Sequence, residues 1–462
     1  MSVRSVSVVA LVALGACGLA SACGDTIVII QAGPDGSASS VVDSSTVAPG
    51  PDAETSGDGA ATPVACPAGS ETRISGTVYD PAGKTPLYNV RVFIPSGPLP
   101  PIPTGVPVPD PGTNRCGAGR TCDSEVVNPI VATLSDSKGL FELNGPKVAP
   151  GRNVPLVIQV GKWRRAIVIP EVKACENTKL DRADTRLPKN GSEGDMPQIA
   201  VTTGGCDALE CLLGGIGIDL TEFEAGSVDP RKHVHMYRGE GGAPTLNGAG
   251  IPAATELWSN VDNLRKQDIT MLSCECSESN NTKPAGFDTI RNYADAGGRV
   301  FFTHFHATWL KNNATWGTGI LDFTGTGAGA NPYVINTTFP KGLALSEWLV
   351  EVGASPVAGQ IDMPSGTVTN SQQGLAAGSA AKEWIGRGAT AKHFSFNTPY
   401  KAPLADQCGR VMFSDVHSAT TGGGQFPSAC GVFNRAQVAL EYMFFDLSSC
   451  VQDENLAPAP PK

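Results

Sequence analysis

Two patterns of apolar residues divide this chain near residue 195, and each admits a different class of fold. Between Arg73 and Ile169, short alternating segments are separated by Gly, Pro and Asp and show no helical period. This pattern predicts antiparallel strands packed as a two-sheet β-sandwich over residues 66–190. The expected strands are 74–79, 90–94, 131–134, 141–143, 156–160 and 166–169.

Beyond the segment 190–195, which reads as a linker, apolar strands alternate with helices. The alternation predicts an α/β domain over residues 197–450, with an open, mostly parallel sheet covered by helices on both faces. Functional groups of such a sheet lie at the carboxyl ends of its strands. The expected strands are 199–203, 268–273, 299–303 and 410–414, and the expected helices are 207–213, 255–266, 284–296 and 436–447.

The first 22 residues have the features of an export signal. Arg4 precedes an uncharged run rich in Val, Leu and Ala, which is short for a membrane-spanning helix. Cys17 and Cys23 each follow small residues, in contexts that resemble the lipobox of bacterial lipoproteins. The resemblance implies a lipid anchor on Cys17 or Cys23, and Leu14 favours Cys17. A cleaved signal without lipid, ending near Ala22, is the alternative.

Residues 23–65 are mostly small and polar, and they bury too little apolar surface to fold. They are predicted to be a disordered tether, and residues 451–462 a disordered tail. We expect the protein in the bacterial cell envelope, lipid-anchored at the outer membrane or the periplasmic face. The net charge of −10 and the lack of a basic cluster argue against nucleic acid as a partner.

The cysteine count fits an oxidising compartment. Thirteen cysteines are present, and eleven remain when Cys17 and Cys23 are set aside. Because eleven is odd, at least one thiol is free or pairs with an N-terminal cysteine. Cys116 and Cys122 close a short loop and are predicted to form a local disulfide bond.

Three segments of the β-rich region, 76–80, 86–92 and 136–143, resemble the carboxypeptidase regulatory-like (transthyretin-like) domain family. The similarity covers about residues 72–180, and a Pro-rich insertion at 98–111 departs from it. Asp136 and Gly139 are expected to form the tight turn before the strand at 141–143. The resemblance implies a non-catalytic domain that acts as a spacer or adhesion module.

The second region resembles the class I glutamine amidotransferase-like fold, and within it the trehalose-utilisation (ThuA-like) branch. The resemblance spans about residues 197–450 and rests on Gly204-Gly205 and on the segments 268–274, 293–304 and 409–414. It implies a flavodoxin-like sheet and a nucleophilic cysteine served by a histidine and an acid.

The resemblance implies catalytic candidates with three roles. Cys274 would be the nucleophile and His417 the histidine that serves it, and Asp415 or Glu275 would be the acid that orients the histidine. The flanking glycines and a His-x-Glu motif are absent, however, so glutaminase activity is not expected. In an oxidising compartment, Cys274 would also tend to form a disulfide bond with Cys276, Cys211 or Cys206.

Histidines near the strand ends suggest a metal site. Residues two apart on an extended chain point the same way, so His304, His306, Asp415 and His417 together predict an N/O site for zinc or a similar ion. His233 and His235 form a similar pair. The alternative is that these groups are hydrogen-bonded polar residues without a metal.

The same edge can bind a carbohydrate or other small molecule. Aromatic faces follow the His304 strand, and they suit apolar and saccharide surfaces. His304, His306 and Trp309 are the candidate ligand-binding residues. Core or lid packing is the other interpretation of the aromatic residues, which are Phe305, Trp309, Trp316 and Tyr333.

The sequence is compatible with three functions. The first is an envelope lipoprotein whose non-catalytic β-sandwich spaces an amidotransferase-like domain that binds a ligand or partner. The second is a hydrolase of a carbohydrate or amide, with or without the assistance of a metal ion. The third is a purely structural envelope protein.

Overall fold

The computed structural model describes residues 65–108, 128–317, 319–323, 330–368, 373–418 and 425–460. These residues belong to one compact unit, Ala60–Lys462, of mixed α/β structure. The predicted signal, the tether, Cys17, Cys23 and the Cys116–Cys122 pair lie outside the described residues. Among the described helices, none has the length and apolar character that crossing a lipid bilayer requires.

The N-terminal strands form two small sheets, an arrangement compatible with the predicted sandwich. Alternate side chains of these strands, such as Val92, Phe141 and Ile158, enter a common core. The three-stranded sheet contains β4 (Leu140–Leu143), β1 (Arg73–Thr77) and β7 (Asn177–Lys179). The four-stranded sheet contains β3 (Val131–Leu134), β2 (Arg91–Ile94), β5 (Gly151–Val160) and β6 (Trp163–Val172). A short helix, α1 (Arg182–Thr185), follows.

The predicted turn before β4 is confirmed. Asp136 Oδ1 accepts hydrogen bonds from the backbone N–H groups of Lys138 and Leu140, both at 2.9 Å. Gly139 has φ = +74°, a left-handed conformation that glycine adopts without steric cost.

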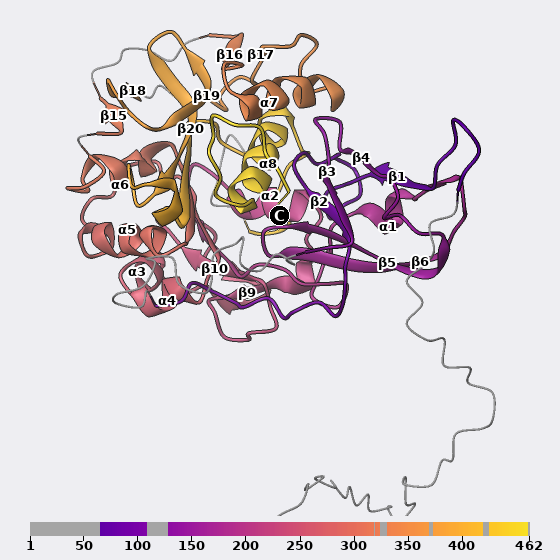
Figure 1. The fold of residues 1–462 in the computed structure, drawn as a ribbon. Helices are drawn as coiled ribbons and strands as arrows, with labels where there is room; N and C mark the ends of the chain where they lie inside the picture. Colours follow the sequence, from indigo (N-terminus) through magenta and orange to yellow (C-terminus); the bar gives the residue numbers. More distant parts are fainter. Residues whose placement is uncertain are drawn as a thin grey trace, which may run out of the picture. The chain divides into compact units, whose positions relative to one another are not determined.

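A ten-stranded mixed sheet dominates the rest of the molecule (Figure 1). In spatial order, six parallel strands are β9 (Phe223–Ala225), β10 (Val234–Arg238), β8 (Ile199–Thr203), β13 (Ile269–Leu272), β14 (Arg299–Thr303) and β21 (Gly409–Ser414). Four antiparallel strands continue the sheet: β20 (Thr390–Thr398), β19 (Lys382–Arg387), β16 (Tyr333–Ile335) and β17 (Gln360–Ile361).

The antiparallel strands were not expected from the sequence. β20 carries Lys392, His393 and Ser395, which are polar and yet fully or almost fully buried. Because these residues interrupt any apolar pattern, β20 does not show the alternation by which a strand is usually recognised. The sheet is therefore mixed, whereas the sequence predicted a mostly parallel one.

Alternate residues of the central strands enter two separate cores, so helices cover both faces of the sheet. On β8, Ile199 and Val201 face one core, and Ala200 faces the other. The first core contains residues of α2 (Leu209–Gly215), α7 (Pro340–Glu351) and α8 (Arg435–Ser448). The second contains residues of α3 (Ala254–Trp258), α4 (Val261–Arg265), α5 (Phe287–Asp295) and α6 (Thr308–Lys311).

The predicted helix 255–266 is two helices, α3 and α4. Asn260 lies between them, and its side chain accepts hydrogen bonds from the backbone N–H groups of Asp262 and Asn263. Because this N-cap begins a new helix, the chain does not continue as one helix through Asn260.

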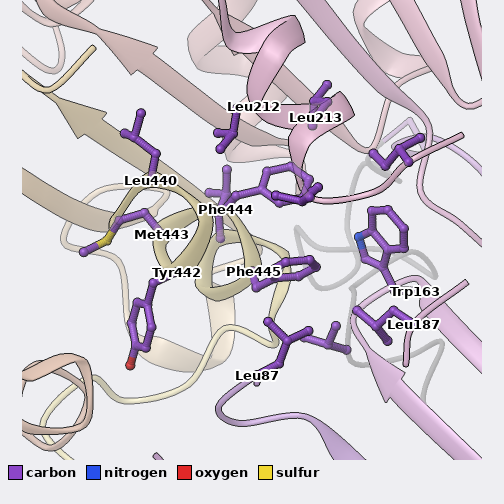
Figure 2. Close-up of a cluster of buried hydrophobic side chains, with 14 of the residues drawn as sticks. Leu87, Trp163, Leu187, Leu212, Leu213, Leu440, Tyr442, Met443, Phe444 and Phe445 are labelled. Carbon is purple, nitrogen blue, oxygen red and sulfur yellow. The ribbon is translucent and has the colours of Figure 1, made fainter. Parts of the chain in front are cut away.

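The last helix, α8, lies between the large sheet and the N-terminal strands. Nearly all of its side chains are buried. Figure 2 shows Leu87, Trp163 and Leu187 from the N-terminal region approaching the helix that carries Phe444 and Phe445. The helix is buried on its second side because the N-terminal strands pack there.

The chain after α8 was expected to be disordered from residue 451, yet residues 451–460 are placed against the domain. Glu454 is only 9% exposed and forms ion pairs with Arg410 and Lys341. Both cations also pair with Asp446 of α8. A buried charge network therefore holds this segment.

Candidate functional site

Three side chains converge at the carboxyl edge of the large sheet. Cys274, His304 and His417 follow the adjacent parallel strands β13, β14 and β21, respectively. Their sulfur and ring nitrogen atoms lie within 4.8 Å of one another. Cys274 Sγ lies 3.4 Å from His304 Nδ1, and the centroids of the two histidine rings are 5.1 Å apart. The group could hold a metal ion.

The loops that carry these side chains have an unusual backbone. His304 has φ = +44° and Cys276 has φ = +67°, in a region that residues with a side chain rarely adopt. Cys276 is held by a disulfide to Cys206, in the loop after β8. Such backbone conformations concentrate at functional sites, where the surrounding structure enforces them.

Glycine at position 204 is required by the close approach of two loops. A Cβ atom there would lie 2.2 Å from the carbonyl oxygen of Cys274. The Gly204-Gly205 pair therefore packs the end of β8 against the loop that carries Cys274. Packing explains the glycine pair without a ligand.

Burial sets the protonation states of the Cys274 thiol and the His304 imidazole. Burial raises the pKa of the Cys274 thiol to about 11, although the backbone N–H groups of Phe305 and Cys276 oppose this shift. Burial, and next the charge of His417, lower the pKa of His304 to about 3. At neutral pH the thiol is protonated and a poor nucleophile, whereas the neutral imidazole can bind a metal.

His417 has a nitrogen atom free for a ligand. Its side chain is buried, and its Nε2 atom has no hydrogen-bond partner. Buried polar atoms are nearly always paired, so an unpaired one calls for an explanation such as an absent ion or water. The chemistry of the three side chains therefore fits a metal ion.

Cys274 is the only described cysteine outside a disulfide bond. The sequence suggested that it would pair with Cys276, Cys211 or Cys206. Instead, Cys206 pairs with Cys276 and Cys211 pairs with Cys430, which leaves the Cys274 thiol free. Cys66 pairs with Cys175, and Cys408 and Cys450 are also disulfide-bonded.

His306 and Asp415 do not join the converging group. The chain after β14 forms a 3-10 turn, His304–Ala307, so His304 and His306 do not point the same way as they would on a strand. His306 Nε2 lies 3.4 Å from Glu275 Oε2. Asp415 pairs with Lys392 of β20 at 3.3 Å.

Trp309, a candidate for ligand binding, packs in the core. It is 1% exposed and makes edge-to-face contacts with Trp258 and Phe287. Trp316 is equally buried and packs against Phe396. In this structure both indoles contribute to packing.

The His233–His235 pair lies elsewhere and is hydrogen-bonded. His233 Nδ1 lies 2.6 Å from Glu222 Oε2, and His235 Nδ1 lies 2.8 Å from Glu224 Oε1. Both positions are at or near the start of β10, and the candidate site is at the opposite, carboxyl edge of the sheet. For His233 and His235, the structure therefore matches the alternative to a metal site, in which the histidines are hydrogen-bonded polar residues.

Asp207 and Ser418, which were not among the candidates predicted from the sequence, lie beside the group. Asp207 Oδ1 accepts hydrogen bonds from Ser418 N at 2.8 Å, Ser418 Oγ at 2.6 Å and Ala208 N at 2.9 Å. Asp207 follows β8 at the same edge of the sheet. The rule that functional groups follow parallel strands would have identified it.

A second, buried cluster of side chains packs next to the loops that carry Cys274 and His304. Glu275, next to Cys274, forms an ion pair with Lys283 and lies close to His306. Lys283 Nζ also lies 5.4 Å from the ring centroid of Trp258. The cluster fixes Glu275, the residue after Cys274, and His306, two residues after His304.

Comparison with known proteins does not assign this chain to a family. No protein-family model matches it, and no curated protein sequence matches it. The Cys274, His304 and His417 group and the residues around it are therefore the basis for a function.

Proposed function

We propose that this chain is an exported envelope protein whose α/β domain binds a zinc ion through Cys274, His304 and His417 and uses it to hold a small ligand. The observation that carries the proposal is the convergence of three donor atoms from three adjacent strands. Thiolate and imidazole are donors that zinc prefers. Three protein ligands leave a fourth position open, as in zinc sites that bind water or substrate.

The surrounding architecture is part of the same proposal. The N-terminal strands would be a carboxypeptidase regulatory-like sandwich, and the α/β domain an amidotransferase-like domain without glutaminase activity. Disulfide bonds support a compartment outside the cytoplasm. A lipid on Cys17 or Cys23 would attach the protein to a membrane, and the ligand would be a carbohydrate or another small molecule.

A metal-assisted hydrolase is the second candidate, and the open coordination position favours it. A zinc ion with three protein ligands can activate a bound water molecule for attack on an amide or glycosidic substrate. Turnover by the zinc-loaded protein, lost in the ligand variants, would distinguish the hydrolase from a binding protein.

The full chain, exported into an oxidising compartment and stripped of metal, is expected to bind one zinc ion. With Co²⁺ in place of zinc, a thiolate-to-metal absorption band in the near ultraviolet would report coordination by Cys274. Loss of an outer-shell partner already costs 10–100-fold in metal affinity, so Cys274→Ser and His417→Ala should each weaken binding by at least about 100-fold.

His233→Gln is the matched control, because His233 is bonded to Glu222 near the opposite end of the sheet. It should leave the affinity for zinc unchanged. A wild-type protein that binds no metal, or an equal loss in His233→Gln, would contradict the proposal.

Metal affinity is also expected to rise with pH. The thiol of Cys274, with a pKa of about 11, must lose its proton to bind metal, whereas His304, with a pKa of about 3, is already neutral. Each unit of pH near neutrality should therefore tighten binding up to about tenfold. Calorimetric titrations in buffers of different ionisation enthalpy should detect at least one proton released per zinc ion. Affinity independent of pH would exclude Cys274 as a ligand.

A further inference from the structure

Asp207 is attached to the loops that carry two of the three proposed ligands. It follows β8, which pairs with β13, so it stands at the edge where the donors converge. The backbone N–H of its neighbour Cys206 donates to the carbonyl of Cys274 at 3.1 Å. Its own carboxylate accepts two hydrogen bonds from Ser418, the residue after His417.

The second oxygen of this carboxylate has no partner. The side chain of Asp207 is fully buried, and Oδ2 makes no hydrogen bond. None of the ion pairs in the described part of the chain involves Asp207. A buried carboxylate without a nearby cation is costly, and a buried oxygen without a donor is rare, so we expect a positive charge near this carboxylate and a donor opposite Oδ2.

Hydrogen bonds place Asp207 beside the site. Ser418, which donates to Oδ1, is the residue after His417, and Cys206, which donates to the carbonyl of Cys274, is the residue before Asp207. Asp207 is therefore linked to two of the proposed ligands through adjacent residues, so its charge would act on a cation that they bind.

We propose that Asp207 is the anionic partner of the metal centre and that Oδ2 accepts a hydrogen bond from a neutral hydroxyl or amide group of the ligand. This inference rests on the proposed function. A divalent ion bound by one thiolate and two neutral imidazoles carries one net positive charge. The carboxylate of Asp207 cancels that charge, so the site prefers neutral hydroxyl-bearing ligands, such as a saccharide, over anions.

Asp207→Asn tests the charge while keeping the geometry. The Oδ1 atom of asparagine can still accept the three hydrogen bonds from Ala208 and Ser418. Because the variant lacks the negative charge, zinc affinity at pH 7 should fall roughly 10-fold or more. Acetate should bind to the Co²⁺-loaded variant more tightly than to the Co²⁺-loaded wild type, as followed by the cobalt spectrum.

Glu210→Gln is the matched control. Burial raises the pKa of Glu210 to about 8, so this carboxyl is mostly protonated at pH 7 and its replacement changes little charge. Zinc affinity and acetate binding should stay at the wild-type level in this variant.

Ser418→Ala separates the charge of Asp207 from its structural role. The variant loses one hydrogen bond to Asp207 but keeps the carboxylate, so zinc affinity should remain within a few-fold of wild type. If Ser418→Ala weakens zinc binding as much as Asp207→Asn, Asp207 serves only to hold the loop, and the inference is overturned.

The failure of this inference can be distinguished from failure of the proposed function. If wild type binds no zinc, the metal site itself is absent. If wild type binds zinc and loses it in Cys274→Ser, but Asp207→Asn changes neither zinc affinity nor acetate binding, only the role of Asp207 is refuted.

Discussion

Lys283→Met is expected to lower the free energy of unfolding by about 3–5 kcal/mol, the usual cost of removing one partner of a buried ion pair. Lys283 and Glu275 form such a pair, and both side chains are almost completely buried. Burial alone would raise the pKa of Glu275, but contacts with His306 and Lys283 outweigh it and lower the pKa to about 2. Without Lys283, the carboxylate would remain buried with one cation missing. Urea denaturation at pH 7 measures the loss.

Lys311→Met provides the comparison for this variant. Lys311 pairs with Glu278 at 3.0 Å, but both side chains are substantially exposed to solvent. Exposed ion pairs contribute about 0–1 kcal/mol, so this change should have a small effect. Equal effects of the two substitutions would show that the Glu275–Lys283 pair does not stabilise the fold. Because Glu275 adjoins Cys274, Lys283→Met should also weaken zinc binding.

Trp163→Ala should cost about 3–5 kcal/mol, because it removes a large aromatic side chain from a packed core. Trp163 is fully buried, and its ring centroid lies 6.4 Å from that of Phe444 and 6.1 Å from that of Phe445 (Figure 2). The core that contains these rings includes side chains of the N-terminal strands and of the large sheet. We therefore expect one cooperative unfolding transition in wild type, shifted as a whole in Trp163→Ala.

Val168→Ala, on the same strand β6, is the control. Val168 is 60% exposed, so its truncation should change stability by no more than about 0.5 kcal/mol. Two separate transitions in urea, with Trp163→Ala shifting only the one that reports the N-terminal strands, would show that the two regions unfold independently. That outcome would contradict the shared core.

The sequence by itself determined the parts of the fold that depend on local pattern. The strands β8, β13, β14 and β21 are short runs of buried apolar residues, and each occurs within one or two residues of its predicted position. The helix α5 lies within the predicted segment 284–296 and buries Ile290 and Ala294, four residues apart on one face. The period of the apolar residues predicts these strands and helices because it reflects which residues, close in sequence, share one face of an element. It also indicated the strand edge that carries His304 and His417.

Only the tertiary structure decided which side chains meet at that edge. His304 joins Cys274 whereas His306 does not, because the chain turns into a 3-10 helix after β14. Cys274 stays free because Cys206 lies where it can pair with Cys276.

The same holds for Asp207 and for strand β20. Asp207 reaches Ser418 across more than 200 residues of sequence, and Lys392 of β20 is buried against Asp415. These contacts depend on distance in space and on burial, which residue spacing along the chain does not encode. The sequence thus located the edge of the sheet, and the packing of distant loops selected the residues of the candidate site.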